Sequence, residues 1–149
     1  MDRAQDLGLE TVSFFPLQSR DRFPLLLNAA DIHLVVQKHK ASDLVMPSKL
    51  GNILAAGRPF IATTWPETEL GRVTMESKAG LLTPPEDAGA LAQAINHLAQ
   101  AEDAREKMGR RARQFAEAWL GRDKIMAEWE GLLYGLVNLA RRDEGRDRI

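Results

Sequence analysis

Between residues 47 and 57 the apolar positions follow the spacing of a helix. Leu50, Ile53 and Leu54 fall on one helical face. Pro47 suits the first turn of a helix, where its missing N–H costs nothing, and Gly57 suits the end of one. The pattern therefore predicts a helix of about three turns that begins at Pro47 and packs on a sheet.

Short runs rich in β-forming residues predict four strands, because turn residues bound each run. Their expected ranges are 11–15, 32–36, 59–63 and 79–82. Apolar residues at helical spacing predict further helices at 2–7, 19–29 with Ser19 as N-cap, 68–76, after the N-cap Asp87, and from Glu102 onward with a break at Gly121. The alternation indicates an α/β domain over residues 1–140, with helices on both faces of a partial Rossmann-like parallel sheet, a helical C-terminal extension and a charged tail at 141–149.

Composition excludes several classes of function. The chain has 149 residues, of which 44% are hydrophobic and 28% charged, with a net charge of −1 and no cysteine. A dedicated nucleic-acid binder needs a basic surface, and disulfides and thiolate metal sites need cysteine. No apolar run approaches the roughly 20 residues that span a bilayer. We expect a cytoplasmic protein without metal or cofactor, and membrane contact stays open through a partner or a lipid-linked acceptor.

The loop before the predicted helix at 47–57 has the physical properties of an anion site. A helix N-terminus presents N–H groups without intrahelical partners and the positive end of the helix dipole. Ligands of open α/β sheets bind at the carboxyl edge, where this helix begins. Ser48 and Lys49 add a hydroxyl and an ammonium group suited to a phosphate. Ordinary solvated residues of a first helical turn are the open alternative.

The same stretch carries a family resemblance. Its pattern Pro-x-Lys-Leu-x-x-x-Leu-Ala-x-Gly-Arg-Pro, followed by a β-branched strand, resembles the nucleotide-sugar-binding half of family 4 glycosyltransferases, which have the GT-B fold. Met-Pro-Ser-Lys-Leu at 46–50 is most similar to the colanic-acid or exopolysaccharide type. The resemblance runs from about Leu9 to Ala99 and includes Ala30-Asp31-Ile32, Glu69-Leu70 and Gly80-Leu81-Leu82.

That resemblance implies a donor-binding domain and the transfer of a sugar from a nucleoside diphosphate in polysaccharide biosynthesis. In the family, two strand–helix units and an acceptor domain precede the segment that 11–15 matches. The resemblance therefore implies either that a separately encoded N-terminal part is a partner or that the chain is a fragment of such an enzyme, and in both cases that the chain is inactive alone. A nucleotide- or phosphate-binding module without turnover, and a domain that only self-associates, are the alternatives.

The resemblance also implies donor-binding residues, position by position. Main-chain atoms that hold the nucleobase in the family fall at Pro16 and Leu17. Backbone N–H groups that face the diphosphate and sugar fall at Met46, Ser48 and Lys49.

The paired glutamates of the family are not present in their usual form. The second, which grips the ribose, falls at Asn52, whose amide can bond a hydroxyl but brings no charge. The first falls at Leu44, with Asp43 adjacent. The donor sugar and base therefore stay unassigned, and no residue of the chain is assigned a catalytic role.

Two expectations concern assembly. Segment 11–15 is expected to pair with 32–36 through a right-handed crossover, which gives the strand order 11–15, 32–36, 59–63, 79–82; exchange of this strand with a second chain is the alternative. The C-terminal helices carry more apolar positions than a surface helix needs, Trp119, Trp129 and Leu136 among them. These positions need another surface, either the chain's own sheet or a second copy of the chain, and we expect a homodimer.

Overall fold

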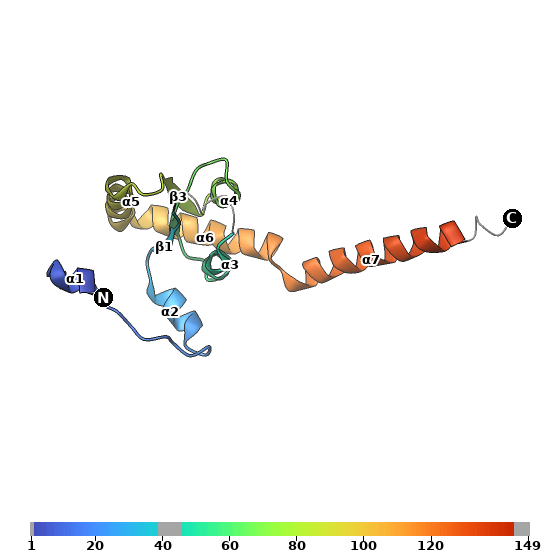
Figure 1. Cartoon of the computed structure of the whole chain (residues 1–149), viewed down its shortest axis with the longest axis horizontal. Helices are drawn as coiled ribbons and strands as arrows, with labels where there is room; N and C mark the ends of the chain where they lie inside the picture. Colours follow the sequence, from blue (N-terminus) through green and yellow to red (C-terminus); the bar gives the residue numbers. More distant parts are fainter. Residues whose placement is uncertain (1, 39–45, 145–149) are drawn as a thin grey trace.

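The computed structural model describes residues 2–38 and 46–144, and its centre is a parallel sheet (Figure 1). Three strands form the sheet in the order β1-β2-β3: β1 (His33–Val36), β2 (Phe60–Thr63) and β3 (Gly80–Thr83). The strands are in register, so that the last residues of all three lie side by side at the carboxyl edge. The predicted strands at 32–36, 59–63 and 79–82 are confirmed to within one residue.

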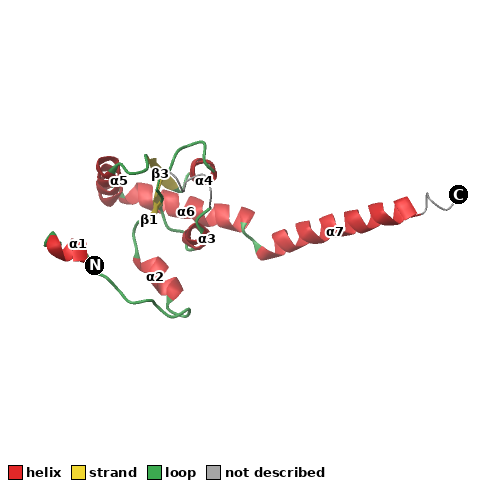
Figure 2. Ribbon diagram, viewed as in Figure 1, coloured by secondary structure: helices red, strands yellow, loops and turns green. Residues whose placement is uncertain are grey.

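Seven helices lie within the described part of the chain (Figure 2). They are α1 (Asp2–Asp6), α2 (Phe23–Ala29), α3 (Ser48–Ala55), α4 (Glu69–Ser77), α5 (Ala88–Gln100), α6 (Glu102–Trp119) and α7 (Arg122–Glu144). The predicted cap Asp87 is confirmed, because its side chain accepts a hydrogen bond from the first turn of α5; Thr68, which was not predicted as a cap, does the same for α4.

Helices cover both faces of the sheet. Alternate residues of each strand point to opposite faces, so each face has its own set of packed side chains. Val35, Phe60 and Ala62 lie on one face and share a buried cluster with apolar residues of α3, α4 and α6. The other face of β2 carries Ile61, which is also fully buried, and α5 contacts β2 and β3. The core therefore centres on β2, whose four residues are all buried.

Local sequence signals explain where α3 lies and how it ends. Leu50, Ile53 and Leu54 are buried, as their spacing predicted. After the helix the chain reverses at Gly57, whose φ of +65° favours glycine. The helix has 8 residues, about two turns, and is shorter than predicted.

The strand predicted at 11–15 is wrong, and with it the four-stranded order. In the structure this segment is an irregular connection in which Phe14 and Phe15 are exposed. Alternation and β-forming residues stabilise a strand only when a neighbouring strand supplies its hydrogen bonds and covers one face. Among residues 2–38 and 46–144, β2 is the one strand that pairs with β1, and Leu34 and Val36 are exposed.

Two helix boundaries also differ from prediction. The helix expected from Ser19 begins at Phe23, and its N-cap is Arg22 without a side-chain bond. Pro24 explains the later start: it is tolerated in a first turn but would break a helix five residues from its beginning. At the other end α7 continues to Glu144, so the tail expected to fray from 141 is helical over its first residues.

The longest helix, α7, projects away from the sheet and the other helices (Figure 1). The break predicted at Gly121 is confirmed, because α6 ends at Trp119 and α7 begins at Arg122. Neither α7 nor any other helix in the described residues is long and apolar enough to cross a membrane.

Candidate functional site

The N-terminus of α3 differs from those of the other long helices. Its N-cap Pro47 forms no side-chain bond to the first turn, and that turn contains no acidic residue. By contrast, Thr68 and Asp87 cap α4 and α5, and α6 begins with Glu102 and Asp103. The N–H groups and the positive end of the α3 dipole are thus not neutralised by a cap or carboxylate of this helix.

Three of the residues predicted for the site share the outer side of α3. Ser48, Lys49 and Asn52 are exposed, and Asn52 follows Ser48 by four positions and Lys49 by three, so that it is a neighbour of both on the helix surface. Met46, just before the helix, is 41% exposed. A hydroxyl and an ammonium group are therefore exposed in the first turn of α3, and an amide is exposed one turn further along.

An apolar groove of about 450 Å³ reaches this helix end. It runs between α3, α4 and α6, and Met46, Pro47 and Ser48 form part of its wall. Phe115 and Trp119 of α6 stack in it, with ring centroids 6.0 Å apart. The groove offers apolar contact and two carboxylates, Glu69 and Glu76, beside the site.

A threonine holds β1 to β2 at the carboxyl edge. The Gln37 backbone N–H donates to Thr63 Oγ1 over 2.9 Å, and that hydroxyl donates to the Gln37 carbonyl over 3.1 Å. The contact lies directly after the last residue of β1 and extends the strand pairing by a side chain. It fixes where the chain leaves β1 toward the N-terminus of α3.

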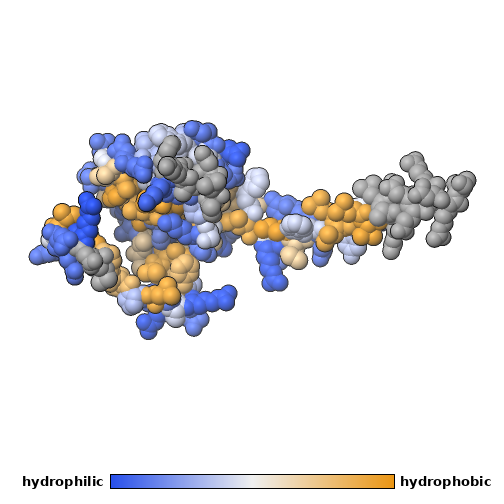
Figure 3. All heavy atoms as spheres, in the orientation of Figure 1, coloured by the Kyte–Doolittle hydropathy of each residue, from blue (hydrophilic) through white to orange (hydrophobic). Residues whose placement is uncertain are grey.

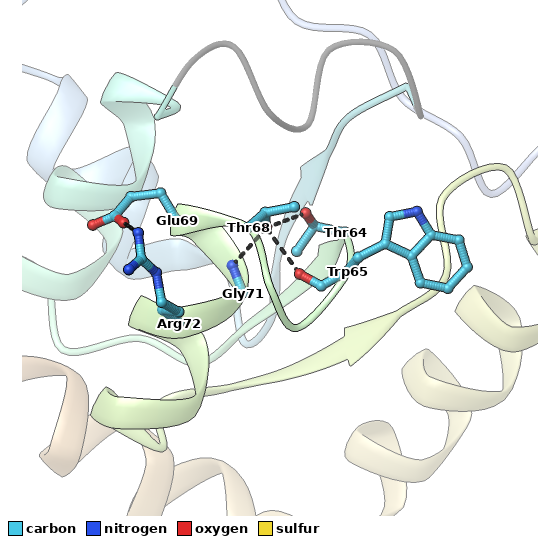
Figure 4. A network of polar contacts seen from close by, with 6 residues as sticks. All are labelled: Thr64, Trp65, Thr68, Glu69, Gly71 and Arg72. Atoms are coloured by element: carbon cyan, nitrogen blue, oxygen red, sulfur yellow. Dashed lines mark hydrogen bonds and ion pairs between the residues drawn. The ribbon is translucent and has the colours of Figure 1, made fainter.

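Thr68 organises the turn between β2 and α4 (Figure 4). Its hydroxyl donates to the Trp65 carbonyl over 2.8 Å and accepts from the Gly71 backbone N–H over 3.0 Å. Because that proton is used on Trp65, the buried Thr64 hydroxyl at 2.8 Å is the donor to Thr68. Two hydroxyls thus close this turn beside the carboxyl edge.

Gly71 and an ion pair complete the first turn of α4. A Cβ on Gly71 would lie 2.1 Å from the Trp65 carbonyl oxygen, so only glycine fits so close to the turn. On the outer side, Arg72 and Glu69 form an exposed ion pair (Figure 4), and such pairs contribute little to stability. The turn between β2 and α4 is therefore held mainly by the buried hydroxyls of Thr64 and Thr68.

The structure brings together only part of the predicted set of residues. Met46 and Ser48 line the groove, and Lys49 and Asn52 lie on the exposed side of the same helix. Pro16 and Leu17 lie in the irregular segment before α2, Leu17 is fully exposed, and neither lines the groove. Asp43 and Leu44 lie outside the described residues.

Sequence reasoning missed the threonines of the carboxyl edge. Thr63, Thr64 and Thr68 are all buried and hydrogen-bonded there. Their position in the sequence was the available signal: Thr63 is the last residue of β2, the most buried strand, and Thr64 follows it directly. For metals, no group of three or more potential side-chain ligands occurs among residues 2–38 and 46–144.

A second pocket, of about 480 Å³, lies at the opposite, amino edge of the sheet. Arginines dominate its wall, yet they are engaged in structural contacts: Arg58 with the Asn28 carbonyl, Arg113 with the Ala55 carbonyl, and Arg105 with the carbonyls of Leu98 and Ala99. These bonds tie helix ends together. The pocket is therefore a weaker candidate than the α3 end.

Comparison with known proteins identifies the family. The sequence model described as glycosyl transferases group 1 matches residues 1–115. The match covers more than half of the chain, which therefore belongs to the group 1 glycosyl transferases.

One curated relative and one solved structure are similar to this chain. Over 128 residues the chain is 40% identical to an Escherichia coli (strain K12) protein named as a colanic acid biosynthesis glycosyl transferase, WcaI. That alignment covers 85% of this chain but only 30% of WcaI. Sucrose-phosphate synthase from Thermosynechococcus elongatus superposes with a TM-score of 0.76 over 93% of this chain and 33% of its own, at 24% identity. The latter likeness shows the fold alone, and it confirms the α/β fold of GT-B type.

Proposed function

We propose that the chain is the donor-binding portion of a glycosyltransferase that transfers a sugar from a nucleoside diphosphate in polysaccharide biosynthesis. The α3 N-terminus, with Ser48 and Lys49, binds the diphosphate, and Asn52 reaches a hydroxyl of the ribose. Family membership and the 40% identity to WcaI support the reaction class. Because the chain spans about a third or less of these two proteins, the complete activity is itself part of the proposal.

One observation carries the assignment of the diphosphate. Of α3, α4 and α5, which begin at the carboxyl edge, α3 alone starts with neither a capping side chain nor an acidic residue in its first turn. A diphosphate would satisfy the open N–H groups and the dipole together. The lysine ammonium group adds a charge-assisted hydrogen bond.

Sugar transfer also needs an acceptor and groups that face the donor from another domain. We propose that these come from the N-terminal part of the transferase, and that the donor-binding portion alone binds donor without turning it over. Pro16 and Leu17 are left out of the proposed site, because the strand that was to position them does not form. Cytoplasmic location stays a prediction, to be tested by cell fractionation.

Calorimetric titration tests the proposal. The chain is titrated with a panel of nucleoside diphosphates and their sugar conjugates, with inorganic phosphate for comparison. Lys49→Ala should weaken the binding of the best ligand by about 1–3 kcal/mol, or roughly 5- to 150-fold in Kd, which is the range for one hydrogen bond to a charged group. Lys107, another exposed lysine, lies on α6; Lys107→Ala is the matched control and should leave Kd unchanged.

The outcomes separate the parts of the proposal. Binding without release of sugar, weakened only by Lys49→Ala, supports it. Unchanged affinity in Lys49→Ala removes this lysine from the site. Absence of binding by every nucleotide at millimolar concentration rejects donor binding by this chain.

A further inference from the structure

Helix α7 is connected to α6 through a joint of two residues, Leu120 and Gly121. Figure 3 shows α7 as an arm that projects from the rest of the protein beyond this joint. We propose that Lys124, in the first turn of α7, holds the joint at one angle and so fixes the direction of α7. It does this through a bridge, the contacts of one side chain with the last turn of α6 across the break between the two helices.

The C-terminus of α6 attracts a cation that its own sequence does not supply. The last turn of this helix contains no basic residue. A helix C-terminus presents carbonyl groups without intrahelical partners and the negative end of the helix dipole. The Leu120 N–H donates to the Ala116 carbonyl over 2.8 Å, so the carbonyls that follow Ala116 need partners from beyond the helix.

Lys124 supplies this cation from the other side of the break. Its Nζ donates to the Ala118 carbonyl, in the last turn of α6, over 2.7 Å. The same ammonium group lies 5.4 Å from the centre of the Trp119 ring, within the range of a cation–π contact. One charge thus contacts both the backbone and the last side chain of α6 from the first turn of α7.

Trp119 connects the bridge to the core. Its ring stacks on that of Phe115, with centroids 6.0 Å apart and an angle of 23° between the planes. Phe115 in turn packs against the buried cluster that includes Leu50 and Leu54 of α3. A continuous series of contacts therefore runs from the core through the two rings to Lys124.

The joint itself is packed closely against both neighbouring helices. A Cβ on Gly121 would lie 3.0 Å from the Glu117 carbonyl oxygen, which is closer than an ordinary van der Waals contact. On the other side, Leu120 Cδ1 would lie 3.6 Å from a Cβ on Gly51 of α3. Leu120 also lines the groove that reaches the free end of α3. The bridge therefore sets the direction of α7 relative to the helix that carries the proposed donor site.

Exposed contacts of this kind are individually weak. They can still determine the angle of the joint, because α7 contributes none of the buried hydrophobic residues in the described structure and no larger packing energy competes with them. Loss of the bridge should therefore let α7 swing about the joint while α6 and α7 both stay folded.

Distances between spin labels test the proposal. The chain has no cysteine, so two substitutions to cysteine place two nitroxide labels. Labels at Gln93 of α5 and Asn138 of α7, both exposed positions, report the angle at the joint. Labels at Glu128 and Asn138, both on α7, report whether that helix is intact.

The pair at 93 and 138 should give one narrow distribution of distances when Lys124 is present. Lys124→Met keeps a side chain of similar length but removes the charge and the donor, so this distribution should widen by several Å. A swing of about 20° at the joint moves position 138, roughly 24 Å along the helix from Arg122, by about 8 Å.

Two further variants show whether the effect is specific. Lys124→Arg keeps a cation that can donate to the same carbonyl, and should keep the distribution narrow. Lys107→Met removes an exposed lysine from the first half of α6 and is the matched control, which should leave the distribution unchanged. In every variant the pair at 128 and 138 should keep its distance.

Four results would overturn the proposal. The first is a broad distribution for the 93 and 138 pair while Lys124 is present, and the second is an equal width with Lys124→Met. The third is an equal widening with Lys107→Met, which would assign the effect to net charge. The fourth is a matching change in the pair at 128 and 138, which would assign it to loss of helix. No nucleotide is added in these measurements, so the proposed donor site is tested separately.

Discussion

Single hydroxyl groups determine the geometry of the carboxyl edge. Thr63 ties the end of β1 to β2, and Thr68 closes the turn into α4. Both side chains are buried, so their hydrogen bonds are shielded from water. Removing such a hydroxyl leaves buried backbone groups without partners.

Thr68→Val should therefore lower the free energy of unfolding by about 1–2 kcal/mol, since it removes an N-cap and leaves the Gly71 N–H unsatisfied. Thr68→Ser keeps the hydroxyl and should recover most of this loss. Urea unfolding followed by circular dichroism measures both variants. Equal stability of the valine and serine variants would show that the hydroxyl network does not stabilise this turn.

At the scale of elements, a close backbone contact sets the position of α6 against the end of α3. A Cβ on Gly109 of α6 would lie 2.5 Å from the carbonyl oxygen of Gly57, in the turn after α3. Arg113, one turn further along α6, donates to the Ala55 carbonyl at the end of α3 over 2.8 Å. Glycine at 109 thus permits a contact that a side chain would prevent.

Gly109→Ala and Gly131→Ala should change stability in opposite directions. Helix propensity favours alanine at both positions by up to about 1 kcal/mol. At 109 the new methyl group forces α6 from the Gly57 turn, an overpacking cost of about 1–3 kcal/mol that exceeds the gain. Thermal unfolding should show a lower Tm for Gly109→Ala and an equal or higher one for Gly131→Ala. A raised Tm in both would mean that the turn yields without cost.

Elements with signals at both ends could be predicted from the sequence. For α3 and β2, Pro47, Gly57 and the run Phe60-Ile61-Ala62 all indicate the same boundaries. The segment 11–15 has the composition of a strand, but whether it forms one depends on a neighbour that is distant in the sequence. Local pattern contains no information about that neighbour, which is why this prediction failed.

The candidate site, like the fold, could be predicted only where local sequence signals define it. The free end of α3 follows from Pro47 and from the place of a helix after a strand. The Gln37–Thr63 contact joins residues 26 positions apart, and only the pairing of β1 with β2 brings them together. Tertiary hydrogen bonds of this kind require the fold before they can be assigned.

At the scale of the whole molecule, the chain combines a packed α/β body with a long helix outside it. The body buries Phe60, Leu54 and Leu98, whereas α7 contributes none of the buried hydrophobic residues in the described structure. The two parts should therefore differ in stability, and a partner should affect α7 far more than the body.

Heating should then unfold α7 before the body. With two interior glycines and none of the buried hydrophobic residues of the described structure, α7 is a marginal helix, so its helicity should be lost at a lower temperature than that of the body. We expect the helical circular dichroism signal to fall in two steps on heating, the first from α7 and the second from the body. Gly131→Ala with Gly135→Ala should raise the midpoint of the first step and leave that of the second unchanged, because alanine stabilises a helix interior and neither new methyl group meets the body. A single step, or a first step that the two alanines leave unchanged, would show that α7 does not unfold separately from the body.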